Sequence, residues 1–512
     1  MKAVSAAQMR TLDKRTIEEA GISGELLMAR AGIGAGKIIA SFLRSLPGIH
    51  AQRIILLAGK GNNGGDAYVA ARFLRENFSP IPVIVYSICN PDELPKDAKT
   101  HALRLPADVP CIVKNELGKH DFMPGDIIVD ALLGTGSTGA PRQPCDQWIK
   151  IVNASGLPVI ALDIPSGLDA SDGTCAETAM RADMTIAMGL PKRGFFLNRG
   201  PGLCGLLRCV DIGIPDAFVA ETKSDINVTM HEDIRPLLPR LPADSHKNSC
   251  GRVLVAGGSS AYPGAPALSA NAALRSGAGL VFLAFPSAAN VKNDTNAIIP
   301  RALPDAGCGV FCAESLASLE DLAASVDAVV FGPGISQENG ILPVLGWACR
   351  LEKALVLDAD ALNLLAANPK ILPSRNAPLI LTPHPGEMRR LLDGFGLKTE
   401  NERSLQALSL AQKTGGIVVL KGHRSIVASP DGNWAVNGSG SPALATAGSG
   451  DVLSGTIGAF LAAGMPAFDA ARAAVFAHGL AGELSPFGDR GLIADELPEL
   501  IPLALRELSP FA

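Results

Sequence analysis

Three segments in the first half of the sequence place acidic or amide side chains and glycines directly after short apolar runs. They are Gly59 to Asp66, Asp130 to Gly139 and Asp163 to Gly167. Ligands of open parallel sheets bind beyond the carboxyl ends of the strands, so chemistry is expected in these segments. Glycines let the backbone approach a ligand, and free amides at the start of a helix attract an anion. Asp130 or Asp163 alone could merely cap a turn or helix. Together with the two glycine loops, they predict one ligand cleft.

A fourth segment, near the end of the chain, combines glycines with a carboxylate. Gly448 and Gly450 flank a serine, Asp451 follows at once, and a helical apolar stretch begins at Val452. The first amides of such a helix would attract a phosphate and place Asp451 beside it. A carboxylate there can take a proton from a substrate hydroxyl that attacks a phosphoryl group. We therefore predict phosphoryl transfer with Asp451 as the base, the alternative being a simple helix cap.

Short apolar runs separated by helix-length segments indicate that parallel sheets with crossover helices position these residues. In the first half the expected strands are 53–58, 82–88, 126–131, 158–162, 184–188 and 206–212. In the second half they are 252–256, 280–285, 328–331, 354–357, 379–381 and 417–420, with a hairpin of 426–428 and 433–436 around Asp431-Gly432. Helices are expected over 3–20 and, with Ser23 as its cap, up to Ile38.

The 512 residues exceed the roughly 250 to 300 that one hydrophobic core supports, so two domains are expected. The best boundary is the stretch 213–248, which contains four prolines at positions 215, 236, 239 and 242 and no sustained apolar period. We predict a first domain over 1–220, a linker and lead-in segment over 221–245 and a second domain over 246–512. The predicted fold class is α/β, with a Rossmann-like three-layer sandwich followed by an α/β/α domain.

Charge and composition argue against several classes of partner. A net charge of -5 gives no basic surface for nucleic acid, and three tryptophans and three tyrosines provide few stacking platforms. The ten cysteines lack the paired spacing and companion histidines of a zinc site, so we expect reduced thiols. Charges interrupt the first thirty residues, and no stretch reaches the roughly 20 uninterrupted apolar residues that span a bilayer. We expect no nucleic acid, no membrane, a cytoplasmic location and a homo-oligomer.

The first half resembles the YjeF N-terminal family, the NAD(P)H-hydrate epimerases, over roughly residues 5 to 215. The strings Asn62-Asn63-Gly64-Gly65-Asp66 and Asp163-Ile164-Pro165-Ser166-Gly167 carry this resemblance. It implies that the hydrated dinucleotide is bound by Asn62, Asn63, Gly64, Gly65, Asp66, Gly134, Thr135, Gly136, Ser137, Thr138, Gly139, Ala140 and Asp163. It also implies a potassium ion held by Asn63, Asp130 and Ser166, whose oxygens suit a hard cation.

Epimerisation at C6 of the hydrated nicotinamide ring requires a positioned proton donor and acceptor. Our hypothesis at this point is that Asp163 serves as the acid and base, with Asp130 restricted to the ion. If the first half is instead a non-catalytic binding module, these carboxylates have no such role. The presence of Asn63, Asp66, Asp130 and Asp163 together favours an active epimerase.

The second half resembles ribokinase-like enzymes, and specifically the NAD(P)H-hydrate dehydratases, over roughly residues 228 to 505. Besides 444–455, the supporting strings are 257–259, 262–265, 332–334, 358–363, 382–387 and 421–425. The resemblance implies nucleotide contacts from Lys421, Gly422, His423, Arg424, Ser425 and Gly450. It implies contacts to the hydrated dinucleotide from Ala267, Gly334, His384 and Asp451. Magnesium and ADP or ATP would be required, and full-length fusions of this kind resemble the bacterial, ADP-using form.

A kinase-like fold can dehydrate because phosphate is a better leaving group than hydroxide. Phosphate transfer to the C6 hydroxyl, followed by elimination, would restore the dihydronicotinamide of NADH or NADPH from its hydrate, NADHX or NADPHX. A small-molecule kinase that releases a phosphorylated product remains the competing interpretation, although the strings 382–387 and 421–425 favour the dehydratase.

Simpler roles stay open for four residues of the second half. Lys421 could be a surface lysine, and His384 could be purely structural. Asp358 and Asp360 could satisfy turn backbone or contact magnesium or a phosphate-bound water. The residues do not distinguish ADP from ATP, or NADHX from NADPHX.

Overall fold

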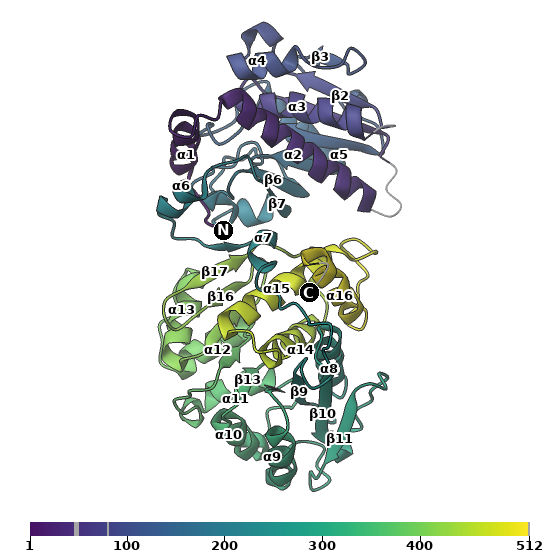
Figure 1. The fold of residues 1–512 in the computed structure, drawn as a ribbon, viewed down its shortest axis with the longest axis vertical. Coiled ribbons are helices and arrows are strands. Elements are labelled where there is room, and N and C mark those ends of the chain that lie inside the picture. The colour runs from purple at the N-terminus through teal and green to yellow at the C-terminus, as the bar shows by residue number, and fades with distance from the viewer. Residues whose placement is uncertain (46–50, 79–80, 510–512) are drawn as a thin grey trace. The chain divides into compact units, whose positions relative to one another are not determined.

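The computed structural model describes residues 1–45, 51–78 and 81–509. The chain forms two compact units, Met1–Val228 and Thr229–Ala512, each built from a sheet and flanking helices (Figure 1). The division falls within the segment 221–245 that we predicted as a linker. That segment contains the last residue of α6 (Asp216–Glu221), β8 (Val228–Thr229) and α7 (His231–Ile234).

The first unit contains a seven-stranded parallel sheet in the order β3-β2-β1-β4-β5-β6-β7. Its strands are β1 (Arg53–Ala58), β2 (Val83–Ser87), β3 (Cys111–Val113), β4 (Asp126–Ala131), β5 (Val159–Leu162), β6 (Met184–Met188) and β7 (Leu206–Val210). Its longer helices are α1 (Ala6–Glu18), α2 (Gly24–Ser45), α3 (Asn62–Asn77), α4 (Lys96–Ala102) and α5 (Cys145–Ser155). All six predicted strands are confirmed, and β3 is an edge strand that we did not predict.

Both faces of this sheet are buried. Ile54 and Leu56 of β1 belong to one apolar cluster, and the alternate residues Ile55 and Leu57 belong to another that contains Trp148 of α5. Because successive side chains of a strand point to opposite faces, helices must cover the sheet on both sides. The predicted three-layer sandwich is thus confirmed.

Helix α2 is the most apolar long helix of the first unit. Ser23 Oγ accepts the Leu26 amide at 3.2 Å and caps it, as predicted. By length and composition the window Gly24–Arg44, with a mean hydropathy of 1.5, could cross a membrane, but half of it is buried within the protein. At Gly32 a Cβ would lie 2.4 Å from Val69 Cβ of α3. The small and apolar residues of α2 therefore bring it into close packing with α3.

The second unit contains a ten-stranded sheet in the order β11-β10-β9-β12-β13-β14-β15-β16-β17-β8. Besides β8, its strands are β9 (Arg252–Ala256), β10 (Leu280–Pro286), β11 (Ile299–Leu303), β12 (Ala328–Phe331), β13 (Ala354–Leu357), β14 (Leu379–Leu381), β15 (Ile417–Leu420), β16 (Ile426–Ala428) and β17 (Trp434–Asn437). Pairing is parallel from β11 to β15 and antiparallel from β15 through β17. The predicted hairpin is confirmed, with Gly432 at φ +92° in its turn.

Helices connect most of the parallel strands of the second unit, and further helices follow its last strand. After α7 they are α8 (Ala265–Arg275), α9 (Leu316–Ala324), α10 (Leu342–Arg350), α11 (Asp360–Ala367), α12 (Pro385–Gly394), α13 (Arg403–Thr414), α14 (Ser449–Ala462), α15 (Ala467–Glu483) and α16 (Leu497–Leu508). One apolar core joins Val253 and Val255 of β9 to Ile457 of α14 and Ala474 of α15. The alternate residue Leu254 is also fully buried, so this sheet is covered on both faces.

Candidate active sites in the two units

The first unit has a cleft of about 1370 Å³ at the carboxyl ends of β1, β4 and β5. Most of the predicted epimerase residues line it, namely Asn62, Asn63, Asp66, Gly134, Thr135, Gly136, Ser137, Thr138, Gly139, Ala140 and Asp163. Gly64 and Gly65 do not belong to this lining. A Cβ on Gly64 would lie 2.0 Å from Gly59 O, and one on Gly65 would lie 2.4 Å from Met28 Sδ. These two glycines let α3 start close against its neighbours.

Asp130, at the end of β4, lies fully buried beneath this cleft. Its carboxylate accepts hydrogen bonds from Ser166 Oγ at 2.7 Å, from Ser166 N at 2.8 Å and from Leu132 N at 3.2 Å. All three donors are neutral, and burial raises the pKa of Asp130 to about 6. A carboxylate buried among neutral donors would be stabilised by a cation.

The side chain of Asn63 supplies a further oxygen in this region. Its Nδ2 donates to Leu133 O and Leu162 O, both at 3.1 Å, whereas its buried Oδ1 has no hydrogen-bond partner in the part of the chain that the structure describes. Within the described ranges no group of three or more His, Cys, Asp or Glu residues could hold a metal ion. The donor set around Asn63, Asp130 and Ser166 is thus one of oxygens alone, which suits a hard cation.

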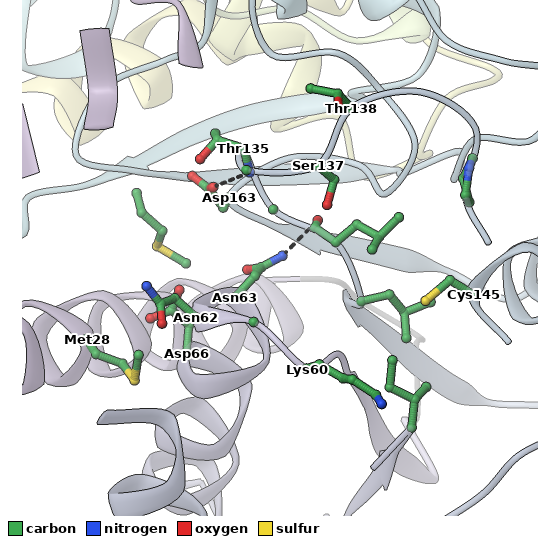
Figure 2. A pocket seen from close by; sticks show the side chains of 18 of the residues that line it. Met28, Lys60, Asn62, Asn63, Asp66, Thr135, Ser137, Thr138, Cys145 and Asp163 are labelled. Carbon is green, nitrogen blue, oxygen red and sulfur yellow. Dashed lines mark hydrogen bonds between the residues drawn. The ribbon is translucent and has the colours of Figure 1, made fainter. Parts of the chain in front are cut away.

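Asp163 projects into the cleft from the loop after β5 (Figure 2). Its backbone is left-handed, with φ +63°, a conformation that costs energy in a residue with a side chain. Lys192 Nζ lies 2.6 Å from Asp163 Oδ1, and Thr135 N donates to Oδ2 at 3.4 Å. Lys192 is completely buried and also donates to Met188 O and Leu190 O, both at 2.9 Å. The three ammonium protons of the lysine are therefore all engaged.

Two further carboxyl groups, those of Asp13 and Asp66, line the same cleft. Asp13 comes from α1 and Asp66 from the first turns of α3, where Figure 2 shows it near Asn62. Burial raises the pKa of Asp13 to about 6 and that of Asp66 well above its usual value, and the charge of Asp163 adds to both shifts. Asp13 and Lys192 were missed by the sequence analysis, since Asp13 lies within the helix α1 and the segment around Lys192 resembles an exposed loop.

In the second unit Asp451 lies in the first turn of α14 and is half-buried. Burial, and then the negative charge of Asp358, raise the pKa of Asp451 to about 8. The preceding Gly448 has φ +88°, and a Cβ there would lie 2.7 Å from Leu268 Cδ1 in α8. The first turn of α8, which contains the predicted substrate residue Ala267, is therefore close to the first turn of α14.

The backbones of α8 and α14 also come into close contact one turn further along the two helices. A Cβ on Gly455 of α14 would lie 1.9 Å from Ser269 O of α8. Ser269 Oγ and Ser454 Oγ share a hydrogen bond of 3.3 Å at the same crossing. The glycine at position 455 thus allows the helix contact that places the start of α14.

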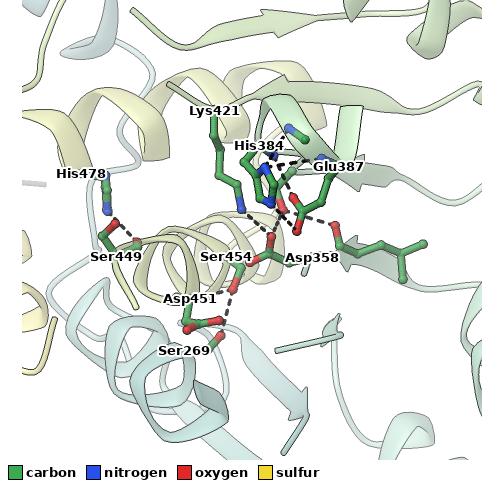
Figure 3. A network of polar contacts seen from close by, with 12 residues as sticks. Ser269, Asp358, His384, Glu387, Lys421, Ser449, Asp451, Ser454 and His478 are labelled. Carbon is green, nitrogen blue, oxygen red and sulfur yellow. Dashed lines mark hydrogen bonds and ion pairs between the residues drawn. The ribbon is translucent and has the colours of Figure 1, made fainter. Parts of the chain in front are cut away.

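Lys421 follows β15 and points to the carboxyl ends of the neighbouring strands (Figure 3). Its Nζ donates to Asp358 Oδ1 at 2.8 Å, and Thr382 Oγ1 donates to the same oxygen at 2.6 Å. Burial alone would lower the pKa of Lys421, but Asp358 and Glu387 raise it above its usual value. A Cβ on Gly450 would lie 3.2 Å from Nζ, so this lysine reaches the start of α14. The alternative of a solvated surface lysine is wrong, because the Lys421 side chain is only 19% exposed.

His384 caps helix α12. Its Nδ1 accepts the amides of Gly386 at 2.9 Å and Glu387 at 3.4 Å, and Glu387 Oε2 accepts the His384 amide at 2.8 Å. Burial and the charge of Lys421 lower the pKa of His384, so the neutral ring carries its proton on Nε2. Burial raises the pKa of the adjacent Glu387 to about 7. His384 therefore has a structural role, and its half-exposed edge remains available to a ligand.

The predicted nucleotide loop, residues 421–425, is held by Arg403 of α13. The Arg403 guanidinium donates to the carbonyl oxygens of His423 at 2.8 Å, Lys421 and Arg424 at 3.3 Å and Leu420 at 3.4 Å. Arg424 is buried and donates to Gly438 O at 2.7 Å, so its side chain faces the interior. A nucleotide would thus meet the backbone of this loop more readily than the guanidinium of Arg424.

Three other residues complete the description of this region. Gly334 has φ +66°, and a Cβ there would lie 2.8 Å from Tyr262 Cβ. The sequence strings 332–334 and 262–265 are therefore in contact in the structure. Asp360 accepts hydrogen bonds from Ser336 N at 3.0 Å and Gln337 Nε2 at 2.9 Å. This is the expected role in which Asp360 satisfies a backbone amide of a turn. His478 of α15, which the sequence analysis missed, is buried with Nε2 2.9 Å from Ser449 O at the start of α14.

Comparisons with known proteins agree with this division of the chain. A YjeF-related N-terminal family model matches residues 24–194, and an NAD(P)H-hydrate dehydratase family model matches residues 253–501. Bifunctional NAD(P)H-hydrate repair enzymes of Moorella thermoacetica and Escherichia coli are 35% and 34% identical to this chain. These matches cover 99% and 96% of this chain and 97% and 92% of the two relatives.

A solved structure of an ADP/ATP-dependent NAD(P)H-hydrate dehydratase from Bacillus subtilis, co-crystallised with ATP and Mg²⁺, is 27% identical. It covers 56% of this chain and 100% of its own, with a TM-score of 0.48. A cleft in one α/β unit and an acidic helix start in a second α/β unit define a two-domain enzyme. The chain belongs to the family of bifunctional NAD(P)H-hydrate repair enzymes. The predicted family and fold classes are confirmed.

Proposed function

We propose that the first unit epimerises (6R)-NAD(P)HX to (6S)-NAD(P)HX and that the second unit dehydrates (6S)-NAD(P)HX to NAD(P)H with ADP or ATP as phosphoryl donor. The observation that carries the proposal is the place of Asp451, half-buried in the first turn of α14 with Lys421 reaching the preceding glycine. This is the arrangement that an attacking hydroxyl and a transferring phosphoryl group require. Family membership favours it over a kinase attached to a silent module.

Dehydration begins with the C6 hydroxyl of the hydrated ring. Asp451 takes the proton of this hydroxyl while the hydroxyl oxygen forms a bond to the terminal phosphorus of the nucleotide. The bond from that phosphorus to the rest of the nucleotide breaks, so AMP leaves from ADP, or ADP from ATP. The α14 amides near Gly450 and the ammonium of Lys421 hold the transferring group. The C6 phosphate then leaves with its bonding electrons, C5 loses a proton to water, and the C5–C6 double bond of the dihydronicotinamide forms.

The nucleotide binds along the loop 421–425, whose carbonyl groups Arg403 holds in place. Mg²⁺, bound together with the nucleotide, would neutralise phosphate charge, and the buried carboxyl of Glu387 suits an oxygen-seeking cation. The hydrated dinucleotide is proposed to contact Ala267, Gly334 and the exposed edge of His384.

Potassium is proposed for the first unit. The support is the buried Asp130, with neutral partners alone among its hydrogen-bond donors, and the buried Asn63 Oδ1 without a partner in the described residues. Such an ion would connect the loops after β1, β4 and β5. It would thereby fix Asp163, which lies three residues before Ser166.

The experiment uses the pure full-length chain and chemically prepared hydrates. With the (6S)-hydrate, Mg²⁺ and ADP or ATP, recovery of near-ultraviolet dihydronicotinamide absorbance is expected, and its initial rate ranks the two nucleotides. With the (6R)-hydrate and nucleotide, recovery requires the first unit as well. Release of a stable phosphorylated hydrate without recovery of absorbance would instead support a kinase.

A further inference from the structure

The chemistry of the hydrated ring sets what an epimerase must supply. C6 carries both a hydroxyl group and the ring nitrogen N1, so its C–O bond can break when the oxygen is protonated and the N1 lone pair forms a C6=N1 bond. Water can then add to either face of the resulting planar cation. Inversion by this route needs one group that gives a proton and another that accepts one.

Asp163 suits only the accepting role. Its Oδ1 lies 2.6 Å from Lys192 Nζ, and the other ammonium protons are donated to Met188 O and Leu190 O. The salt bridge favours the carboxylate, which has no proton to give. Lys192 is completely buried and does not line the cleft, so it cannot reach a substrate.

Asp66 has the opposite environment. It lines the cleft, is only 9% exposed, and its carboxyl makes no hydrogen bond or ion pair within residues 1–45, 51–78 and 81–509. Desolvation without a partner favours the neutral acid, and burial together with Asp163 and Asp13 raises the pKa of Asp66 well above its usual value. A neutral carboxylic acid and a paired carboxylate thus line one cleft.

The charged groups around Asp66 come from several elements. Lys192 and Asp163 lie beyond the ends of β6 and β5, Asp13 lies on α1, and Asp97 of α4 lines the same cleft. Helix α2 presents apolar residues, including Leu27 and Met28, to this cleft. Only Lys192 opposes the rise in the pKa of Asp66, and its ammonium is committed to Asp163.

We infer that Asp66 is the catalytic acid and Asp163 the catalytic base of epimerisation, with Lys192 as the positioning residue of Asp163. This assignment rests on the proposed epimerase function and replaces our hypothesis that Asp163 serves both roles. The Asp66 proton passes to the departing C6 oxygen, the C6–O bond breaks, and water leaves. A second water bonds to C6 from the opposite face and gives a proton to Asp163, while the C6=N1 bond returns to a single bond. Proton exchange with water in the cleft restores both carboxyl groups.

The test follows inversion of (6R)-NADHX by the full chain in H₂¹⁸O without nucleotide, so that the second unit does not consume the product. Proton NMR gives the ratio of C6 epimers, and mass spectrometry gives the oxygen isotope. For the wild type we expect one ¹⁸O in each inverted molecule. Inversion without ¹⁸O would overturn the assignment, because the C6–O bond would then stay intact.

Asp66→Asn is the decisive variant, since it keeps the size of the side chain and removes its proton. We expect kcat to fall at least about 100-fold with little change in KM, and the alkaline fall of the wild-type kcat profile to disappear. Asp66→Glu should recover part of the rate. Asp108→Asn, at an exposed carboxylate outside the cleft, is the matched control and should stay within about twofold of the wild type. A wild-type kcat in Asp66→Asn would overturn the assignment.

Lys192→Met tests the positioning role, and Lys192→Arg is its conservative partner. Because Lys192 holds Asp163 Oδ1 at 2.6 Å, we expect kcat to fall in Lys192→Met with little change in KM, and to recover in Lys192→Arg. Affinity for NADH, measured by fluorescence quenching, reports whether each variant keeps a folded cleft. If the wild type itself does not invert the hydrate, the epimerase proposal fails, whereas wild-type inversion with an active Asp66→Asn variant refutes this assignment alone.

Discussion

Lys421 Nζ lies 2.8 Å from Asp358 Oδ1, although the two residues are 63 positions apart in the sequence. The ion pair joins the end of β15 to the end of β13 across β14, whose following residue Thr382 donates to the same Asp358 oxygen. Asp358 is only 1% exposed. The lysine that we assign to the nucleotide therefore also neutralises a buried carboxylate.

Replacing Lys421 with methionine should damage both functions of this residue. Removing one partner of a buried ion pair typically costs about 3 kcal/mol in the free energy of unfolding, because the other charge stays buried and unpaired. The affinity for ADP, measured by calorimetry, should fall as well. The double variant Lys421→Met with Asp358→Asn separates the effects, since it should recover stability but not nucleotide binding. Recovery of both would show that Lys421 does not contact the nucleotide.

The dehydration rate should increase with pH up to about 8. Asp451 must be ionised to accept the substrate proton, and burial raises the pKa of its carboxyl to about 8. At limiting (6S)-hydrate, kcat/KM should increase nearly tenfold per pH unit below that value and level off above it. Asp451→Asn should remove both the activity and the dependence. A flat profile between pH 6 and pH 8 would show that another group is the base.

The raised pKa of Asp451 also predicts how the stability of the second unit changes with pH. The pKa of Asp451 is raised from 3.8 in the unfolded chain to about 8 in the folded protein. The protonated carboxyl is therefore compatible with folding at pH 4, and stability is lost as the pH rises towards 8. Asp451→Asn should raise the unfolding midpoint of the second unit at pH 8.5 and have a smaller effect at pH 5. Equal effects at both pH values would contradict this linkage.

Two substitutions of His384 should separate its capping role from ligand binding. Asparagine is a good N-cap, so His384→Asn should keep the stability of α12, whereas His384→Ala should lose about 1 kcal/mol. If the exposed edge of the ring contacts the hydrate, KM for the (6S)-hydrate should increase in both variants. An increase in KM for His384→Ala alone would assign the residue to the helix cap.

Potassium should stabilise the first unit more than sodium or lithium at equal ionic strength. Binding to the folded state alone contributes about 2.7 kcal/mol when the ion is at 100 times its dissociation constant. The shift in the first unit's unfolding midpoint should disappear in Asn63→Ala and in Asp130→Asn. Glu93→Gln, on the exposed surface, is the control and should keep the full potassium response.

The central strands could be predicted from sequence because they are continuous apolar runs buried on both faces. The edge strands β3 and β11 could not. All three residues of β3 are exposed, and β11 contains Pro300 and the exposed Arg301, so neither has the pattern of a buried strand. An edge strand is defined by its hydrogen bonds to one neighbour, which leave little trace in hydrophobicity.

The site could be predicted where chemistry lies at strand ends and in glycine loops. Asp163 and Asp451 were found in this way, whereas Lys192 was not, because a Pro-Lys-Arg segment is typical of an exposed loop. Its complete burial follows from tertiary packing alone. Arg403 and His478 act on backbone carbonyls far away in sequence, and single residues within ordinary amphipathic helices carry no signal of that kind.

The crossing of α8 and α14 makes the dehydratase vulnerable at a distance from its chemistry. The Cβ of an alanine at position 455 would lie only 1.9 Å from the carbonyl oxygen of Ser269, so the two helices would have to separate. Separation would shift the amides that we propose to bind phosphate. A glycine-to-alanine change that contacts no ligand could therefore silence the enzyme in a cell that still makes, folds and retains it.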